Sequence, residues 1–206
     1  ELSYRKVIQL KPNYAKAHSN LGNVLRDFGK LQEAEVSYRK AIALNPNFPE
    51  AHLNLGILLK DRGKSQEAFD SYLKAIDINP TLSNVYTKIT KFLKDSDLSQ
   101  LNKSNLKKIL NLLLERNDVP HDELQRAFNL VYCNEIISSL EKLDSDFSNT
   151  DLLVNKKVII HGLKKITFKD IRLEKLLTNI RKYMCHKISE NKEEISFSQL
   201  QFIIAL

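Results

Sequence analysis

The chain has 206 residues, of which 42% are hydrophobic, and it carries a formal net charge of +7. This length is enough to bury a sizeable core in one or two domains. The positive charge is spread along the chain without a dense basic run or a patch interleaved with aromatic residues, which disfavours nucleic-acid binding. Few glycines and prolines, together with apolar residues at helical spacing, predict an all-α protein.

The cysteine content and the apolar runs bear on the compartment. Cys133 and Cys185 each lie in an apolar helical stretch, and the sequence has no signal peptide and no run of about 18 apolar residues. These features predict a reduced, cytoplasmic protein that does not cross a membrane. The sequence opens within a repeat at Glu1 and closes in an apolar run, so we expect it to be part of a longer protein.

The N-terminal half is built from a sequence repeat with a period of 34 residues. Residues 15–48 are followed without insertion by a second copy at 49–82, and the register extends back through a half repeat at 1–14. The apolar spacing within each copy predicts a pair of helices, and such copies stack into a solenoid. The residues that recur unchanged are Ala17/Ala51, His18/His52, Asn20/Asn54, Leu21/Leu55, Gly22/Gly56, Leu25/Leu59, Gly29/Gly63, Glu33/Glu67, Ala34/Ala68, Tyr38/Tyr72, Ala41/Ala75, Ile42/Ile76 and Pro46/Pro80.

Glycine and proline punctuate each copy. Gly22 and Gly56 have no side chain, so the two helices of a pair are expected to approach closely there. Gly29 and Gly63 are expected to close the first helix, because glycine adopts a left-handed backbone at little cost. The proline near the end of each copy stops the second helix, since it lacks the amide proton.

This pattern resembles the tetratricopeptide repeat (TPR) family. The resemblance covers residues 1–97 and implies an α-solenoid of helix hairpins. It is carried by small residues at Gly22, Ala34 and Ala41, large residues at Leu21, Leu25 and Tyr38, and the closing Pro46.

One departure from the family pattern is His18 and His52, which stand where the family usually carries Trp or Tyr. We interpret both histidines as packed structural residues. Equivalent positions on adjacent hairpins lie about one helix-packing distance apart, too far for both to bind one metal ion.

The third unit departs from the repeat soon after it begins. Thr90 replaces the helix glycine, and Asp97 replaces the turn glycine. We predict that residues 83–97 form a capping helix that covers the end of a TPR array spanning 1–97. Residues 98–206 lose the period and are predicted to form an irregular all-helical domain. Its helices are expected near 106–113, 124–131, 152–163, 167–188 and from 196, with a polar linker at 143–150.

In the TPR family the first helix of each pair lines a concave groove, so the resemblance implies a peptide-binding surface. Asn20 and Asn54 form a short ladder there, similar to ladders in the TPR arrays of O-linked N-acetylglucosamine transferases. An asparagine amide can pair with a peptide backbone as donor and acceptor, or it can simply cap or solvate its helix. The predicted groove residues are Asn20, Asn23, Asp27, Asn54, Ile57, Asp61, Lys88 and Lys91; Ser19, Arg26, Leu53 and Lys60 are also expected at this surface.

A second family pattern is the carboxylate clamp of chaperone-binding TPR domains. Asn23, Asn54 and Lys88 meet three of its five positions, but Ser19 and Asn84 stand where the clamp has lysines. A clamp without two of its cations should hold a terminal carboxylate weakly, because charge-assisted bonds supply most of that affinity.

The third unit gives the groove a basic end. Lys88, Lys91 and Lys94 follow one another at near-helical spacing. They favour an acidic partner segment, although a solvated lysine face is an equally simple interpretation.

We find no residues that predict catalysis, a cofactor or a metal site. The sequence lacks a glycine-rich phosphate loop and Cys/His metal spacing, and Cys185 and His186 would point about 100° apart on a helix. We therefore predict a non-catalytic scaffold that binds a peptide or protein segment. The alternative is the substrate-recruiting N-terminal region of a larger methyltransferase or glycosyltransferase, because the chain resembles bacterial proteins that join TPR units to such domains. The partner and the oligomeric state are not in the sequence.

Overall fold

The computed structural model describes residues 1–134 and residue 178, and this part of the chain is helical, with no strand. The chain divides into two compact units, Glu1–Asn102 and Lys103–Leu206. The predicted all-α class is confirmed. The first unit contains α1 (Leu2–Leu10), α2 (Ala15–Asp27), α3 (Leu31–Leu44), α4 (Pro49–Asp61), α5 (Ser65–Ile78) and α6 (Ser83–Asp95). The described part of the second contains α7 (Lys103–Glu115), the 3₁₀ turn η1 (His121–Leu124), α8 (Gln125–Phe128) and the π turn η2 (Asn129–Cys133).

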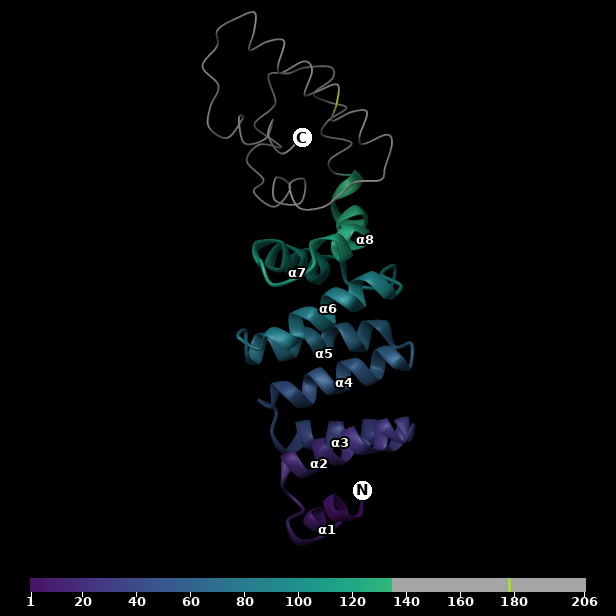
Figure 1. Ribbon diagram of the computed structural model, residues 1–206, viewed down its shortest axis with the longest axis vertical. Coiled ribbons are helices and arrows are strands. Elements are labelled where there is room, and N and C mark those ends of the chain that lie inside the picture. Colours follow the sequence, from purple (N-terminus) through teal and green to yellow (C-terminus); the bar gives the residue numbers. More distant parts are fainter. Residues whose placement is uncertain (135–177, 179–206) are drawn as a thin grey trace, which may run out of the picture. The chain divides into compact units, whose positions relative to one another are not determined.

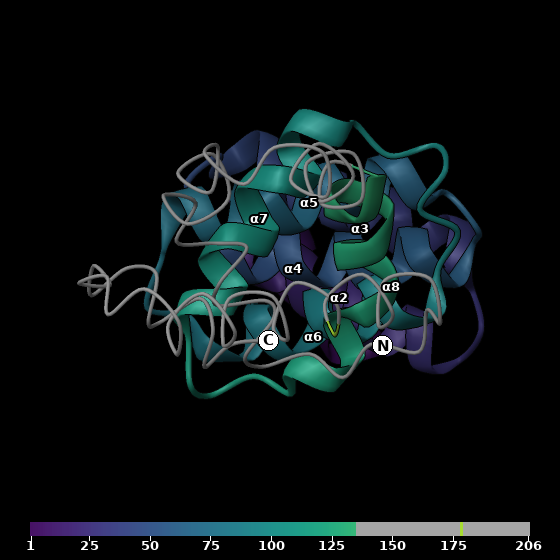
Figure 2. The same cartoon turned by 90° about the horizontal axis from the view of Figure 1, so that it is seen from above.

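The helices of the first unit pair as the repeat predicts. α2 packs on α3 and α4 packs on α5, so each copy of the repeat is one helix hairpin. Figure 1 shows these hairpins following one another from α1 to α6. Seen from above, α3 and α5 lie on one side of this stack, whereas α2 and α6 lie on the other (Figure 2). The arrangement confirms the solenoid of helix hairpins.

Two glycines set how closely the helices of a hairpin approach. A Cβ atom on Gly22 would lie 2.7 Å from Cε1 of Tyr38, and one on Gly56 would lie 2.8 Å from Cε1 of Tyr72. Both tyrosine rings are fully buried, so they cannot move aside for a larger residue. The close approach predicted at these glycines is therefore confirmed. In each hairpin a tyrosine ring from the second helix packs directly against the glycine of the first helix.

The turn inside each hairpin needs glycine for a different reason. Gly29 and Gly63 have φ of 74° and 73°, the left-handed region that favours glycine. In the first hairpin, the Lys30 amide donates to the Leu25 carbonyl at 2.9 Å and the Gly29 amide donates to the Arg26 carbonyl at 2.8 Å. This pair of bonds is a Schellman motif, which satisfies the last carbonyls of the helix. The second hairpin repeats it, so the predicted helix ends are confirmed.

A ring near the start of each first helix ties that helix to the preceding turn. In each case a ring nitrogen or hydroxyl donates to the carbonyl of the proline that lies six residues earlier. This bond gives the two histidines a structural role, and Tyr86 takes the same role in the third repeat. The pairs are His18–Pro12 at 2.8 Å, His52–Pro46 at 3.0 Å and Tyr86–Pro80 at 2.8 Å.

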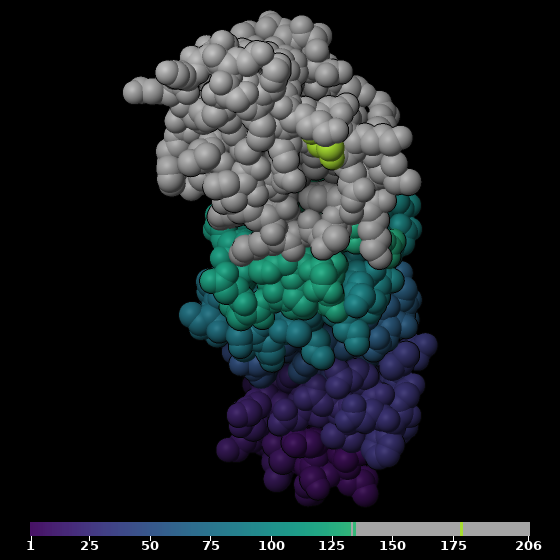
Figure 3. All heavy atoms as spheres, turned by 45° about the horizontal axis from the view of Figure 1, so that its top comes forward, coloured from purple at the N-terminus to yellow at the C-terminus, as the bar shows by residue number. Residues whose placement is uncertain are grey.

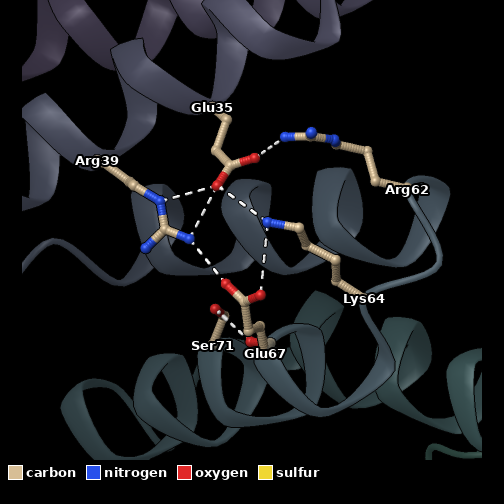
Figure 4. Close-up of polar contacts among 6 residues, drawn as sticks. All are labelled: Glu35, Arg39, Arg62, Lys64, Glu67 and Ser71. Carbon is tan, nitrogen blue, oxygen red and sulfur yellow. Dashed lines mark hydrogen bonds and ion pairs between the residues drawn. The ribbon is translucent and has the colours of Figure 1, made fainter.

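Ion pairs link the second helix of one hairpin to the next hairpin (Figure 4). The nearly buried carboxylate of Glu35 on α3 pairs with Arg39 at 2.9 Å, with Lys64 at 3.7 Å, and with Arg62. Glu67 on α5 closes the network, because it pairs with Arg39 at 2.8 Å and with Lys64 at 3.5 Å. We call these five residues the junction network.

The junction network has a counterpart one repeat earlier and an apolar replacement one repeat later. At the earlier junction, Glu1 pairs with Arg5 at 2.9 Å and with Lys30 at 3.1 Å, and Arg5 pairs with Glu33 at 3.0 Å. At the later junction, the residues in the same register are apolar and mostly buried. They are Phe69 in place of Glu35, Leu73 in place of Arg39, Leu98 in place of Lys64 and Leu101 in place of Glu67.

The first helix of the third repeat, α6, packs through aromatic contacts. The ring of Phe92 stacks on Phe69 with centroids 6.0 Å apart and meets Tyr72 edge-on at 5.6 Å. Thr90, which replaces the glycine of the earlier helices, is buried and donates its hydroxyl to the Tyr86 carbonyl at 2.8 Å. A helix is therefore present where the sequence predicts one, while its role as the cap of the array stays a prediction.

The described part of the second unit begins with α7, which confirms the helix expected near 106–113. Its buried residues include Leu106, Ile109 and Leu113. The next predicted helix is also present, but as a succession of 3₁₀, α and π turns after Pro120. The ring centroids of Phe128 and Tyr132 lie 5.0 Å apart in this segment. The helices predicted at 152–163, 167–188 and from 196, the linker at 143–150, and the Cys185–His186 pair lie outside the described residues.

Candidate functional site

The first helices α2, α4 and α6 carry all the predicted groove residues. α2 contacts α4 and α4 contacts α6, so their surfaces adjoin. Figure 3 shows this part of the chain as neighbouring bands of surface, from purple at the N-terminus to teal. The predicted residues are half-buried or exposed, and we call them the first-helix face: Asn20, Asn23, Asp27, Asn54, Ile57, Asp61, Lys88 and Lys91.

Two further residues expected at this surface contribute little to it. Ser19 is 2% exposed and Leu53 is 4% exposed, so both side chains face the interior of the hairpins. Ser19 stands where a carboxylate clamp has a lysine, so at this position the structure offers neither a cation nor an exposed polar group. The polar character of the face therefore comes from the asparagines and charged residues around these positions.

Asn20 and Asn54 occupy equivalent positions on adjacent helices, one period of 34 residues apart. Both side chains are half-buried, and within the described part of the chain neither amide has a protein hydrogen-bond partner. An unpaired amide keeps both its donor and its acceptor available to a bound segment. Lys88 follows in the same register on α6, so the ladder continues from amide to cation.

Asn23 is committed differently, because its Oδ1 accepts the hydroxyl of Tyr38 at 2.7 Å. Burial raises the pKa of Tyr38 to about 12, with Arg26 opposing the shift and Asp27 adding to it. The hydroxyl therefore stays protonated near neutral pH and remains the donor. This bond orients the amide of Asn23 and occupies one of the two lone pairs of its oxygen.

Each of the three helices ends with a basic residue followed by an aspartate, a recurrence that the sequence analysis missed. Lys60 on α4 pairs with Asp95 on α6 at 3.7 Å, and Arg26 lies 3.5 Å from its neighbour Asp27. The signal in the sequence is the 34-residue recurrence of a basic residue followed by Asp. The series are Arg26/Lys60/Lys94 and Asp27/Asp61/Asp95.

Two lysines of α6 are left over from this pairing. Lys88 and Lys91 are exposed, and among the described residues neither forms an ion pair. Because unpaired cations attract carboxylates, the α6 end of the first-helix face is its most basic part.

A second, open concavity of about 400 Å³ lies between the second helices α3 and α5, with its floor on α4. A smaller counterpart of about 310 Å³ lies one repeat earlier. The sequence analysis did not single out these surfaces, although Leu21/Leu55 and Ser37/Ser71 line them at the same period. Arg39 and Glu33 on their rims are engaged in ion pairs.

Two searches of the described residues bear on other kinds of site. No group of three or more His, Cys, Asp or Glu side chains there could hold a metal ion. Among the same residues, no helix combines the length and the apolar character needed to cross a bilayer.

Stacked helix hairpins with an exposed polar face define an α-solenoid of the protein-interaction class. Comparison of the sequence with family profiles makes this specific. Profiles described as tetratricopeptide repeat match residues 3–36 and 49–82, and one described as TPR repeat matches residues 22–63. The N-terminal part of the chain thus consists of tetratricopeptide repeats, a fold that typically serves as a non-catalytic scaffold for protein interactions.

Comparison with solved structures returns further similarities. One is YrrB, a TPR protein with an unusual peptide-binding site, at 17% identity and a TM-score of 0.49, covering 98% of this chain and 96% of that one. Another is the MamA protein, at 20% identity and a TM-score of 0.42, and the match covers 94% of this chain and 84% of that one. A third is PilF of Pseudomonas aeruginosa, at 19% identity and a TM-score of 0.45, and the match covers 100% of this chain and 88% of that one. No protein of curated function matches the sequence.

Proposed function

We propose that the first-helix face binds an extended peptide segment of a partner protein and that the chain acts as a non-catalytic scaffold. The observation that carries this proposal is the pair of uncommitted amides, Asn20 and Asn54, one repeat apart on adjacent helices. Adjacent helices pack about 10 Å apart, and an extended chain advances about 3.3 Å per residue, so a segment of about ten residues would cross all three helices.

We further propose that the segment carries acidic residues where it meets α6. Lys88 and Lys91 provide two exposed cations without a counter-ion in the described part of the chain. In the middle of the face, by contrast, Lys60 is paired with Asp95 and offers less free charge. The acidic residues would therefore lie toward one end of the bound segment and fix its direction.

The test uses a library of random peptides of about twelve residues displayed on phage, with the most frequent binder then synthesised. We expect the double variant Asn54→Ala/Lys88→Ala to bind this peptide at least about tenfold more weakly, because it loses an amide pair and a charge-assisted contact. Fluorescence anisotropy measures the affinity, and thermal unfolding checks that the fold is kept.

A matched control is Asn47→Ala/Lys40→Ala, which removes the same residue types from exposed positions outside the first helices. This control should bind like the parent. Unchanged binding by Asn54→Ala/Lys88→Ala, or recovery of no peptide at all, would contradict the proposal.

The alternative role in a larger transferase stays a prediction, because the profile matches concern the repeats alone. The cytoplasmic location also stays a prediction from the sequence.

A further inference from the structure

The second hairpin repeats the buried tyrosine of the first hairpin but lacks the acceptor for its hydroxyl. Each ring lies against the glycine of its own first helix, so the two tyrosines pack alike. Tyr38 donates its hydroxyl to Asn23. The residue that occupies the register of Asn23 in the second hairpin is Ile57, whose side chain has no acceptor, and the hydroxyl of Tyr72 has no hydrogen-bond partner in the described part of the chain.

The ring of Tyr72 is buried, and the whole residue is only 1% exposed. Its hydroxyl oxygen is not among the fully buried polar atoms that lack a partner, so it keeps contact with solvent and a ligand at the surface can reach it. Burial raises the pKa of Tyr72, and the charge of Asp61 adds to that shift, so the hydroxyl is protonated and can donate. The packing places it at the first-helix face, where Tyr38 reaches Asn23 in the hairpin before.

We propose that the Tyr72 hydroxyl is a subsite of the first-helix face and donates a hydrogen bond to an amide carbonyl oxygen of the bound segment. This inference rests on the proposed function. An amide is favoured over a carboxylate for two reasons: the equivalent bond in the first hairpin ends on an amide oxygen, and the negative charge of Asp61 would repel a carboxylate. The ligand oxygen would thus occupy the place that Asn23 Oδ1 fills one repeat earlier.

The first experiment compares Tyr72→Phe with Tyr38→Phe, using the synthesised phage-selected peptide as the probe. Tyr72→Phe should bind about five- to tenfold more weakly, since it loses one hydrogen bond to the ligand, and should melt like the parent. Tyr38→Phe removes a bond within the chain instead, so it should melt earlier and bind like the parent.

The second experiment restores the missing acceptor with Ile57→Asn. The new amide should accept the Tyr72 hydroxyl as Asn23 accepts that of Tyr38, which raises the melting temperature and weakens binding. Adding Tyr72→Phe to Ile57→Asn should then weaken binding no further, because the hydroxyl is already engaged. Ile57→Val keeps the apolar contact and should leave Tyr72 dependence intact.

An alanine scan of the peptide separates the two sources of an amide oxygen. If one Asn or Gln position removes the sensitivity to Tyr72→Phe, the oxygen belongs to that side chain; if none does, it belongs to the peptide backbone. Equal binding by the parent and Tyr72→Phe would overturn the subsite and leave the proposed function standing. An equal loss in Tyr38→Phe would also overturn it, whereas recovery of no peptide would overturn both proposals.

Discussion

At the scale of single residues, one position shows how a donor fixes a helix in each repeat. His18, His52 and Tyr86 all donate to the carbonyl of the proline six residues before them. Histidine and tyrosine are thus equivalent donors at this position. They differ in titration, because only histidine gains a charge between pH 5 and 8.

The variant His52→Tyr tests this difference. Burial lowers the pKa of His52 below its ordinary value of 6.5, with the Pro46 carbonyl opposing the shift and Lys74 adding to it. The folded chain therefore binds fewer protons here than the unfolded chain. The stability contributed by His52 is full above pH 6.5 and is lost as the pH falls through the lowered folded pKa.

We expect the free energy of unfolding to fall less between pH 6.5 and about pH 5 in His52→Tyr than in the parent chain, while the two should be similar at pH 7.5. Urea unfolding at a series of pH values measures the difference. Identical pH dependence in parent and variant would contradict the assignment.

Sequence reasoning reached part of this residue-scale picture. The histidines are predicted to be structural because two copies in adjacent hairpins suit packing better than metal binding. The bond to the proline carbonyl could not be predicted, since it depends on how the turn folds back over the helix. The unpaired hydroxyl of Tyr72 was missed for a similar reason. It becomes visible only when the structure shows that Tyr38 reaches Asn23.

At the scale of elements, the three junctions between repeats use different chemistry at the same register. The first is an exposed ion network, the second is a nearly buried one around Glu35, and the third is apolar around Phe69. Removing one partner of a buried ion pair costs much more than removing one at the surface, because the remaining charges lose their counter-ion. The junctions should therefore respond differently to the same substitution.

The variants Glu35→Gln and Glu33→Gln make this comparison with one chemical change. The Glu35 side chain is 11% exposed and holds three cations, so Glu35→Gln should lower the free energy of unfolding by about 1–3 kcal/mol. The Glu33 side chain is 54% exposed and pairs with Arg5 alone, so Glu33→Gln should cost less than about 1 kcal/mol. Equal costs in urea unfolding would show that the junction network adds no more than surface pairs do.

The sequence predicted the helices of these elements better than their junctions. The 34-residue period, Gly29 and Gly63 placed the hairpins, because periodicity and backbone preference are local properties. The partners of the junction network come from two separate stretches of the chain, 35–39 and 62–67, so only the fold brings them together. The helix after Pro120 was predicted as regular, yet it begins with a 3₁₀ turn and contains a π turn at Asn129–Cys133, which local propensity does not specify.

At the scale of the whole molecule, the repeats were predictable because each copy must bury the same face against its neighbours. That logic covers α2 to α5 and, in weaker form, α6, where Thr90 and Asp97 break the pattern. It does not extend to the residues after 102, which form a separate compact unit without the period. The first-helix face was predicted only through family resemblance, because nothing in a helix period distinguishes a ligand surface from a solvated one.

Stacked repeats should differ in local stability along the array, because each contacts only its neighbours. α1 has no buried residue and exposes Leu2 and Leu10, whereas α4 lies between α3, α5 and α6 and buries an apolar face on both sides. The ion pairs of Arg5 hold α1 only at the surface and contribute little to stability.

In hydrogen–deuterium exchange followed by mass spectrometry on the full chain, we expect amides of α1 to exchange at least about tenfold faster than those of α4. Glu35→Gln should speed exchange in α3 and α5 more than in α1, since the junction network joins the former pair. Equal protection of α1 and α4 in the parent would show that the array opens as one cooperative unit rather than repeat by repeat.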